Sequence, residues 1–277
     1  MKSDPKYCID CQKQQIERAV ELGGVSNKIK QEALKYSKEH VAGVPATEGT
    51  VFHRMIMKEA GKNPFAEEKQ EGTEAATEIL QHIEPTIKTL KDACTAAVAG
   101  NFVDVVTVKS EQELEKVAAA FNIELAIDDF DKAKECFQKG KKILYLTDNC
   151  GEHLFDLLFI KKLNEVGVEV IAAGKESDIT NDATVEDLKN AGFEKYCKVI
   201  SIGSDCIGTN LAEASEEFLN YFETVDLIIS KGMGHYETLS DNPKRILFML
   251  KAKCEPVAND LGVEKDCNVL KFKENST

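Results

Sequence analysis

The chain has 277 residues, of which 43% are hydrophobic and 30% are charged. This balance is typical of a globular protein and excludes a largely disordered one. Its formal charge of −13 repels polyanions, which argues against nucleic acid as the main partner. An anionic substrate can therefore bind only where a metal ion or a few lysines reverse the local field.

The N-terminal segment MKSDPKYCIDCQKQQ is polar and lacks the apolar stretch of a secretory signal. No apolar run approaches the ~18 residues that a membrane span needs. Nine cysteines are scattered along the chain, a pattern that favours free thiols in a reducing compartment. We therefore expect a cytoplasmic protein without a membrane partner, and the sequence leaves its oligomeric state open.

Apolar residues recur at helical spacing through the first hundred residues, which contain little that resembles a buried strand. Helices are predicted over residues 12–22, 27–40, 48–59 and 71–100. Pro85 should kink the last of these or divide it in two. Residues 1–100 are therefore predicted to form an all-helical domain.

Residues 101–277 alternate short β-rich runs with amphipathic helices. The predicted strands cover residues 143–147, 169–173, 198–202, 227–230, 246–251 and 268–272. The predicted helices cover residues 152–166, 184–191 and 211–222. Continuous apolar strands that alternate with helices indicate a Rossmann-like, doubly wound α/β/α sandwich with a mostly parallel sheet.

Oxygen-bearing side chains follow two of the predicted strands. Asp148 and Asn149 come directly after the strand at 143–147, and Asp182 lies in the loop after the strand at 169–173. The carboxyl ends of parallel strands meet at one edge of a sheet, where ligands of such folds bind. Carboxylate and amide oxygens suit a hard divalent cation such as magnesium or manganese. The sequence therefore predicts a cation site formed by these three residues.

Two other strand ends carry groups suited to an anion. Lys231 and Gly232 follow the strand at 227–230 and are expected in a loop that contributes little to the core. Gly203-Ser204 follows the strand at 198–202, and Gly208-Thr209 lies shortly after it. A lysine charge and backbone amides near glycines can bind a phosphoryl group. Each motif alone is also typical of an ordinary turn or helix cap, so the prediction depends on their convergence at one edge.

The chain resembles the metal-dependent damage-control phosphatases, catalogued as domain of unknown function number eighty-nine. The resemblance rests on residues 99–104 (AGNFVD), on 148–152 (DNCGE) with Phe155-Asp156 following, on 181–184 (NDAT) with Asp187, and on 230–237 (SKGMGHYE). It implies a helical N-terminal domain before a Rossmann-like domain, and hydrolysis of phosphomonoesters such as sugar phosphates or damaged phosphometabolites. Cys8 and Cys11 resemble the N-terminal Cys-x-x-Cys of the microbial branch.

The resemblance also implies roles for individual residues. The implied metal ligands are Asp148, Asn149 and Asp182, and the implied catalytic residues are Asp148, Lys231 and Glu237. The residues assigned to the substrate or its phosphate are Asn101 and Asp104, from the motifs of the resemblance, and Ser204 and Gly232, from the strand ends described above. Magnesium, manganese, cobalt and nickel all stay open as the cation. The nucleophile is a metal-activated water or, alternatively, Asp148 through an aspartyl-phosphate.

Two other function classes compete with the phosphatase hypothesis. A nucleotide- or cofactor-binding module without hydrolysis would use the same edge of a Rossmann-like sheet, although a dinucleotide needs glycine amides more than carboxylates. A redox or metal-binding protein would use Cys8 and Cys11, whose spacing suits either role, with Cys254 as a third ligand. The simplest interpretation of these cysteines is reduced thiols that the phosphatase chemistry does not need.

Overall fold

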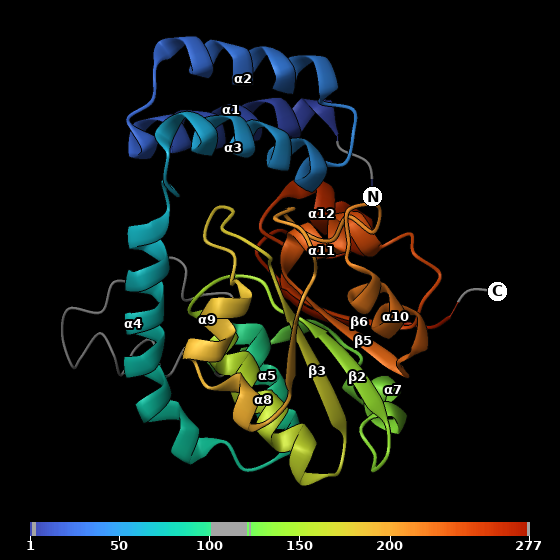
Figure 1. The fold of residues 1–277 in the computed structure, drawn as a ribbon. Coiled ribbons are helices and arrows are strands. Elements are labelled where there is room, and N and C mark those ends of the chain that lie inside the picture. Colours follow the sequence, from blue (N-terminus) through green and yellow to red (C-terminus); the bar gives the residue numbers. More distant parts are fainter. Residues whose placement is uncertain (2–3, 101–120, 122, 276–277) are drawn as a thin grey trace.

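The computed structural model describes residues 1, 4–100, 121 and 123–275. Three helices form a bundle at one end of the molecule (Figure 1): α1 (Pro5–Gly23), α2 (Asn27–His40) and α3 (Pro45–Ala60). Their faces meet around a small core that includes Ile16, Ala33 and Phe52, all without exposed surface. The helices predicted in this region are confirmed.

The predicted division at Pro85 is also confirmed. Helix α4 (Ala66–Ile83) ends in a 3-10 turn (Glu84–Thr86), and α5 (Leu90–Ala99) follows it. Both helices pack against α8 (Glu152–Glu165), and α4 runs down the side of the α/β region in Figure 1. Thr89 caps α5 with its hydroxyl, which accepts a hydrogen bond from the backbone of Asp92. The placement of a domain boundary at residue 100 stays a prediction.

Seven strands form one sheet in the order β1-β7-β6-β5-β2-β3-β4. The strands are β1 (Leu125–Asp128), β2 (Lys142–Leu146), β3 (Glu169–Gly174), β4 (Lys198–Ser201), β5 (Leu227–Lys231), β6 (Ile246–Lys251) and β7 (Asn268–Lys273). Every neighbouring pair is parallel except β6 and β7. The predicted mostly parallel α/β/α sheet is therefore confirmed.

Helices cover both faces of this sheet. They are α7 (Phe130–Ala133), α8, α9 (Val185–Asn190), α10 (Glu216–Thr224), α11 (Gly232–Leu239) and α12 (Glu255–Leu261). Ile143 and Tyr145 of β2 face the core that contains α5 and α8, whereas Leu144 and Leu146 face the core that contains α10, α11 and α12. This alternation follows from the two-residue period of a strand.

Several elements differ from the sequence predictions, which contain no helix at the positions of α7, α11 and α12. Strand β1 is absent from the predictions because it is short and only half-buried, so it lacks the apolar run that marks the central strands. Helix α10 begins at Glu216 rather than at residue 211, because Ser215 caps it with its side chain. Within the described residues no helix has the length and apolar character that a membrane crossing needs.

The order of the strands creates a topological switch point at the centre of the sheet. From β2 the chain continues to β3 on one side, whereas from β5 it continues to β6 on the other side, and β2 and β5 are neighbours. In open parallel sheets, ligands bind in the crevice that forms outside the carboxyl ends of two such strands. Asp148 follows β2 and Lys231 ends β5, so both lie at this crevice.

Candidate functional site

The loop after β2 and the loop after β3 pair directly with each other. Asn149 and Asp182 form an isolated antiparallel bridge. The backbone N–H of Ala183 donates to the carbonyl of Asp148 at 2.7 Å, and that of Cys150 donates to the carbonyl of Asn181 at 2.9 Å. The structure therefore brings Asp148, Asn149 and Asp182 together, although helix α8 and strand β3 separate the first two from the third along the chain.

Asp182 is buried, and its two carboxylate oxygens have different surroundings. Oδ1 accepts a hydrogen bond from the hydroxyl of Thr180 at 2.9 Å. Oδ2 lies 3.4 Å from Nζ of Lys175 but has no hydrogen-bond partner among the described residues. Burial raises the pKa of this carboxyl, and the positive charge of Lys175 opposes that rise. A buried carboxylate oxygen without a hydrogen bond is costly unless another group completes its coordination.

Because Gly232 has no side chain, the carboxylate of Asp148 can pack directly against its backbone. Its φ of +74° is in the left-handed region, and a Cβ atom at this position would overlap the carboxylate of Asp148. Both features require glycine. Gly232 is also the first residue of α11, so the amino end of this helix begins beside Asp148. Gly232, which is predicted to bind phosphate, is therefore a direct neighbour of Asp148, which is predicted to bind the metal.

The orientation of Asn149 is set by Glu152 at the start of α8. The Asn149 amide Nδ2 donates to Glu152 Oε1 at 3.2 Å. Because the nitrogen is used in this way, Oδ1 is the atom that Asn149 can offer to a cation. Glu152 has no exposed surface, and its other oxygen lies 3.5 Å from Nζ of Lys231.

Lys231 belongs to a fully buried network of charges. Its Nζ donates to Asp156 Oδ1 at 2.6 Å and to the carbonyl of Ala97 at 2.8 Å, and Tyr145 donates its hydroxyl to the same oxygen of Asp156 at 2.8 Å. Burial opposes the charge of Lys231, yet Asp156 and Glu152 raise its pKa above the ordinary value. Lys231 is therefore a cation at neutral pH.

The expectation that Lys231 lies in a loop of little structural weight is wrong. It is the last residue of β5, and it has no exposed surface. Its partners Glu152 and Asp156 belong to the motifs on which the resemblance rests, but sequence reasoning gave them no role beside Lys231. They lie one helical turn apart on α8, among apolar residues, and acids embedded in such a helix are a signal of buried charge.

Ser204 lies in a loop that the helical bundle holds in place. Arg54 of α3 forms an ion pair with Asp205, and the backbone of Ile207 donates to the hydroxyl of Thr50 at 3.0 Å. On the inner side of this loop, Lys175 donates to the carbonyl groups of residues 206 and 208. Ser204 is buried, and its role in phosphate binding stays a prediction.

Glu237 is buried on the side of α11 that packs against α3. Its carboxylate accepts a hydrogen bond from the backbone of Ala46, in the first turn of α3, and burial raises the pKa of Glu237 to about 7. A carboxyl group with this pKa can act as an acid or as a base at neutral pH. Its catalytic role stays a prediction. Asn101 and Asp104 lie outside the described residues.

The three cysteines proposed for a second site lie on α1 and just before α12. Cys8 is buried on α1 and Cys11 is exposed one turn later, whereas Cys254 is the half-buried residue that precedes α12. Burial raises the pKa of Cys254 to about 11, so this thiol is protonated at neutral pH. Among the residues that the structure describes, no group of three or more His, Cys, Asp or Glu side chains is arranged to hold a metal ion. A role for these cysteines stays a prediction.

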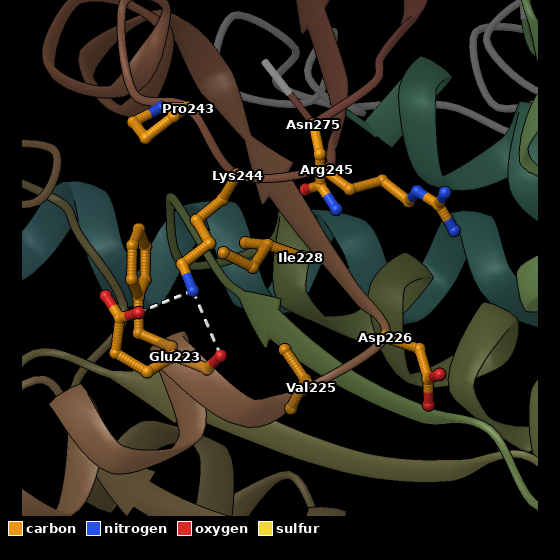
Figure 2. Close-up of a pocket in the computed structure, with 9 residues that line it drawn as sticks. Glu223, Val225, Asp226, Ile228, Pro243, Lys244, Arg245 and Asn275 are labelled. Carbon is orange, nitrogen blue, oxygen red and sulfur yellow. Dashed lines mark hydrogen bonds and ion pairs between the residues drawn. The ribbon is translucent and has the colours of Figure 1, made fainter. Parts of the chain in front are cut away.

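The pocket in Figure 2 lies at the amino ends of the strands, opposite the crevice beside Asp148. Asp226 and Ile228 line it from the beginning of β5, and Lys244 and Arg245 line it from the residues just before β6. Lys244 reaches across it to Glu223, whose backbone carbonyl accepts a hydrogen bond from Nζ at 3.0 Å. This pocket opens at the amino ends of parallel strands and is separate from the crevice beside Asp148.

The fold and the crevice define an α/β protein with an acidic site at the carboxyl edge of a mostly parallel sheet. Residues 5–269 match the damage-control phosphatase ARMT1-like domain, and the chain belongs to this family. The resemblance inferred from the four sequence motifs is thereby confirmed.

Three archaeal relatives and one solved structure are similar to most of the chain. A damage-control phosphatase of Pyrococcus horikoshii is 39% identical, with 96% of this chain and 98% of the relative covered. A damage-control phosphatase of Archaeoglobus fulgidus is 33% identical, with 88% of each covered, and an uncharacterized protein of Methanocaldococcus jannaschii is 38% identical, with 83% and 80% covered. The crystal structure of a P. horikoshii family member has a TM-score of 0.90 at 38% identity and covers 99% of this chain and 100% of its own.

Proposed function

We propose that the chain is a divalent-metal-dependent phosphatase that hydrolyses small phosphorylated metabolites, either sugar phosphates or damaged phosphometabolites. The observation that carries this proposal is the pairing of the loops after β2 and β3, which places Asp148, Asn149 and Asp182 side by side at the switch point. The names of two relatives as damage-control phosphatases support the reaction class.

The donor set fits a hard divalent cation. Two carboxylates and one amide supply oxygen atoms only, which suits magnesium or manganese and admits cobalt or nickel. Oδ2 of Asp182 is buried and makes a long, 3.4 Å ion pair with Nζ of Lys175, so a cation would add to its coordination. When bound, such a cation supplies a Lewis acid that polarises a phosphoryl oxygen.

The other groups at the crevice act on the substrate's charge. Lys231 holds a permanent positive charge at the end of β5, close enough to Asp148 for the two charges to interact. The amino end of α11 beside Gly232 supplies the positive end of a helix dipole. Fixed charges in a site without bulk water stabilise the negative charge that develops on a phosphoryl group in transfer.

The test is phosphate release from a panel of sugar phosphates and other phosphomonoesters. The purified chain is assayed with magnesium, manganese, cobalt or nickel and with a chelator. We expect release that depends on the cation and that Asp182→Asn abolishes. Asp178→Asn is the matched control, because it removes an exposed carboxylate from the same loop.

Two results would count against the proposal. Nucleotide binding without phosphate release under any cation would favour a non-hydrolytic binding module. Release that persists with chelator and in Asp182→Asn would remove the cation site from the mechanism. A redox or metal-binding protein based on cysteine would show neither release nor dependence on Asp182.

A further inference from the structure

Thr180 has a backbone conformation that its residue type disfavours. Its φ is +45°, and among the described residues only Asp266 shares a positive φ without being glycine. A β-branched side chain in the left-handed region is a clear outlier, because its Cβ substituents crowd the backbone. Strain of this kind persists only where surrounding contacts hold it, and it is concentrated at functional sites.

Asn63 supplies one of these contacts from the segment between α3 and α4. The carbonyl of Thr180 accepts a hydrogen bond from Nδ2 of Asn63 at 2.8 Å, and Oδ1 of Asn63 accepts one from the backbone of Phe65 at 3.0 Å. Asn63 is buried, and both ends of its amide are used. The hydrogen bond from Asn63 therefore links Thr180 to the segment between α3 and α4.

The strained conformation has one local consequence. It brings the hydroxyl of Thr180 to Oδ1 of Asp182, to which it donates at 2.9 Å. This hydrogen bond fixes Oδ1, while the other carboxylate oxygen, Oδ2, lies 3.4 Å from Nζ of Lys175. Groups that hydrogen-bond a metal ligand orient it and tune its affinity for the metal.

We propose that Thr180 is a positioning residue for Asp182, and that Asn63 maintains the backbone conformation that this requires. The affinity of the cation site then depends on the segment that joins α3 to α4. This inference rests on the proposed function, because it takes Asp182 as a cation ligand.

Four variants separate the effect of the hydroxyl from that of the strain. Thr180→Val keeps the shape and the strain but lacks the hydroxyl, Thr180→Gly lacks both, and Thr180→Ser keeps the hydroxyl. Asp266→Gly is the control, because it relieves a positive φ at an exposed residue after α12. Each metal-free protein is titrated with Mn²⁺ alone, and its thermal unfolding is recorded.

We expect Thr180→Val and Thr180→Gly to bind Mn²⁺ about tenfold more weakly or worse, the loss typical when a group that orients a ligand is removed. Thr180→Ser and Asp266→Gly should bind as the wild type does. Thr180→Gly should have a Tm at or above that of the wild type, because glycine adopts this backbone without strain. Asn63→Ala should also weaken binding, since it releases the carbonyl of Thr180.

The inference requires that the Mn²⁺ affinity of each variant depends on whether the Thr180 hydroxyl is present, and not on its Tm. Wild-type affinity in both Thr180→Val and Thr180→Gly would overturn the inference, and so would equal losses in Thr180→Ser and Thr180→Val. Asp182→Asn identifies which proposal fails. If it loses Mn²⁺ while the Thr180 variants bind normally, only the positioning role is wrong, whereas wild-type binding in Asp182→Asn would remove the cation site and this inference together.

Discussion

Removal of the Lys231 charge should destabilise the fold and also lower the phosphatase activity. Lys231→Met keeps a side chain of similar length but leaves Asp156 and Glu152 without their buried counter-charge. None of the three side chains has exposed surface. Loss of one partner from a buried ion pair typically costs about 3–5 kcal/mol. That is a large part of the roughly 5–15 kcal/mol by which folded proteins are stable.

The measurement is urea unfolding at neutral pH, followed by circular dichroism. Lys198→Met is the matched control: Nζ of Lys198 lies 2.6 Å from Glu217 Oε1, the same distance that joins Lys231 to Asp156, but both partners are half-exposed. Its unfolding midpoint should change little, because solvent screens exposed pairs.

A compensated variant separates stability from catalysis. Lys231→Met combined with Asp156→Asn and Glu152→Gln removes the buried acids together with the lysine, so most of the lost stability should return. Turnover should stay about a hundredfold or more below the wild type, because a charge that stabilises the transition state is missing. If Lys231→Met is as stable as the wild type, the buried charge of Lys231 does not stabilise the fold.

Three further predictions concern other parts of the molecule. Gly232→Ala should displace Asp148 and weaken Mn²⁺ binding by about tenfold or more, as measured by titration of the metal-free protein. Burial raises the pKa of Glu237 from 4.5 to about 7, so the folded state holds this proton more tightly than the unfolded state does. The free energy of unfolding should therefore fall by up to roughly 3 kcal/mol as pH rises from 4.5 to 7, and urea unfolding of Glu237→Gln should lack this component. Cys8→Ser with Cys11→Ser should lower the Tm at most, and a loss of turnover in a folded, cation-loaded double variant would return the cysteines to the mechanism.

Local sequence patterns were sufficient for the central elements of the fold. Strands β2, β3, β5 and β6 are apolar runs buried on both faces, so composition alone marks them. The start of α10 is set by the local cap Ser215, but the irregular loop before it is held by ion pairs of Asp205 and Glu213 with Arg54, a residue of α3 that is distant in sequence. Local periodicity contains no information about such a contact.

The candidate site was likewise only partly predictable from the sequence. Asp148, Asn149 and Asp182 were predictable because parallel strands place their carboxyl ends at one edge. Their supporting groups were not, since the hydrogen bonds from Thr180 and Asn63 depend on a backbone conformation that propensity disfavours. Partners of this kind become visible only when the tertiary structure is known.

The balance of charges explains why a cation belongs to the proposed mechanism. The carboxylates at and beneath the crevice belong to Asp148, Asp182, Glu152 and Asp156, and the ammonium groups belong to Lys175 and Lys231. These six side chains are all buried, and four carboxylates against two ammonium groups give a formal charge of −2 when all six are ionised. This charge would repel a phosphate dianion, and the low dielectric of a buried site makes the repulsion stronger. One divalent cation would neutralise it, so binding of the cation should precede, and be required for, binding of a phosphorylated substrate.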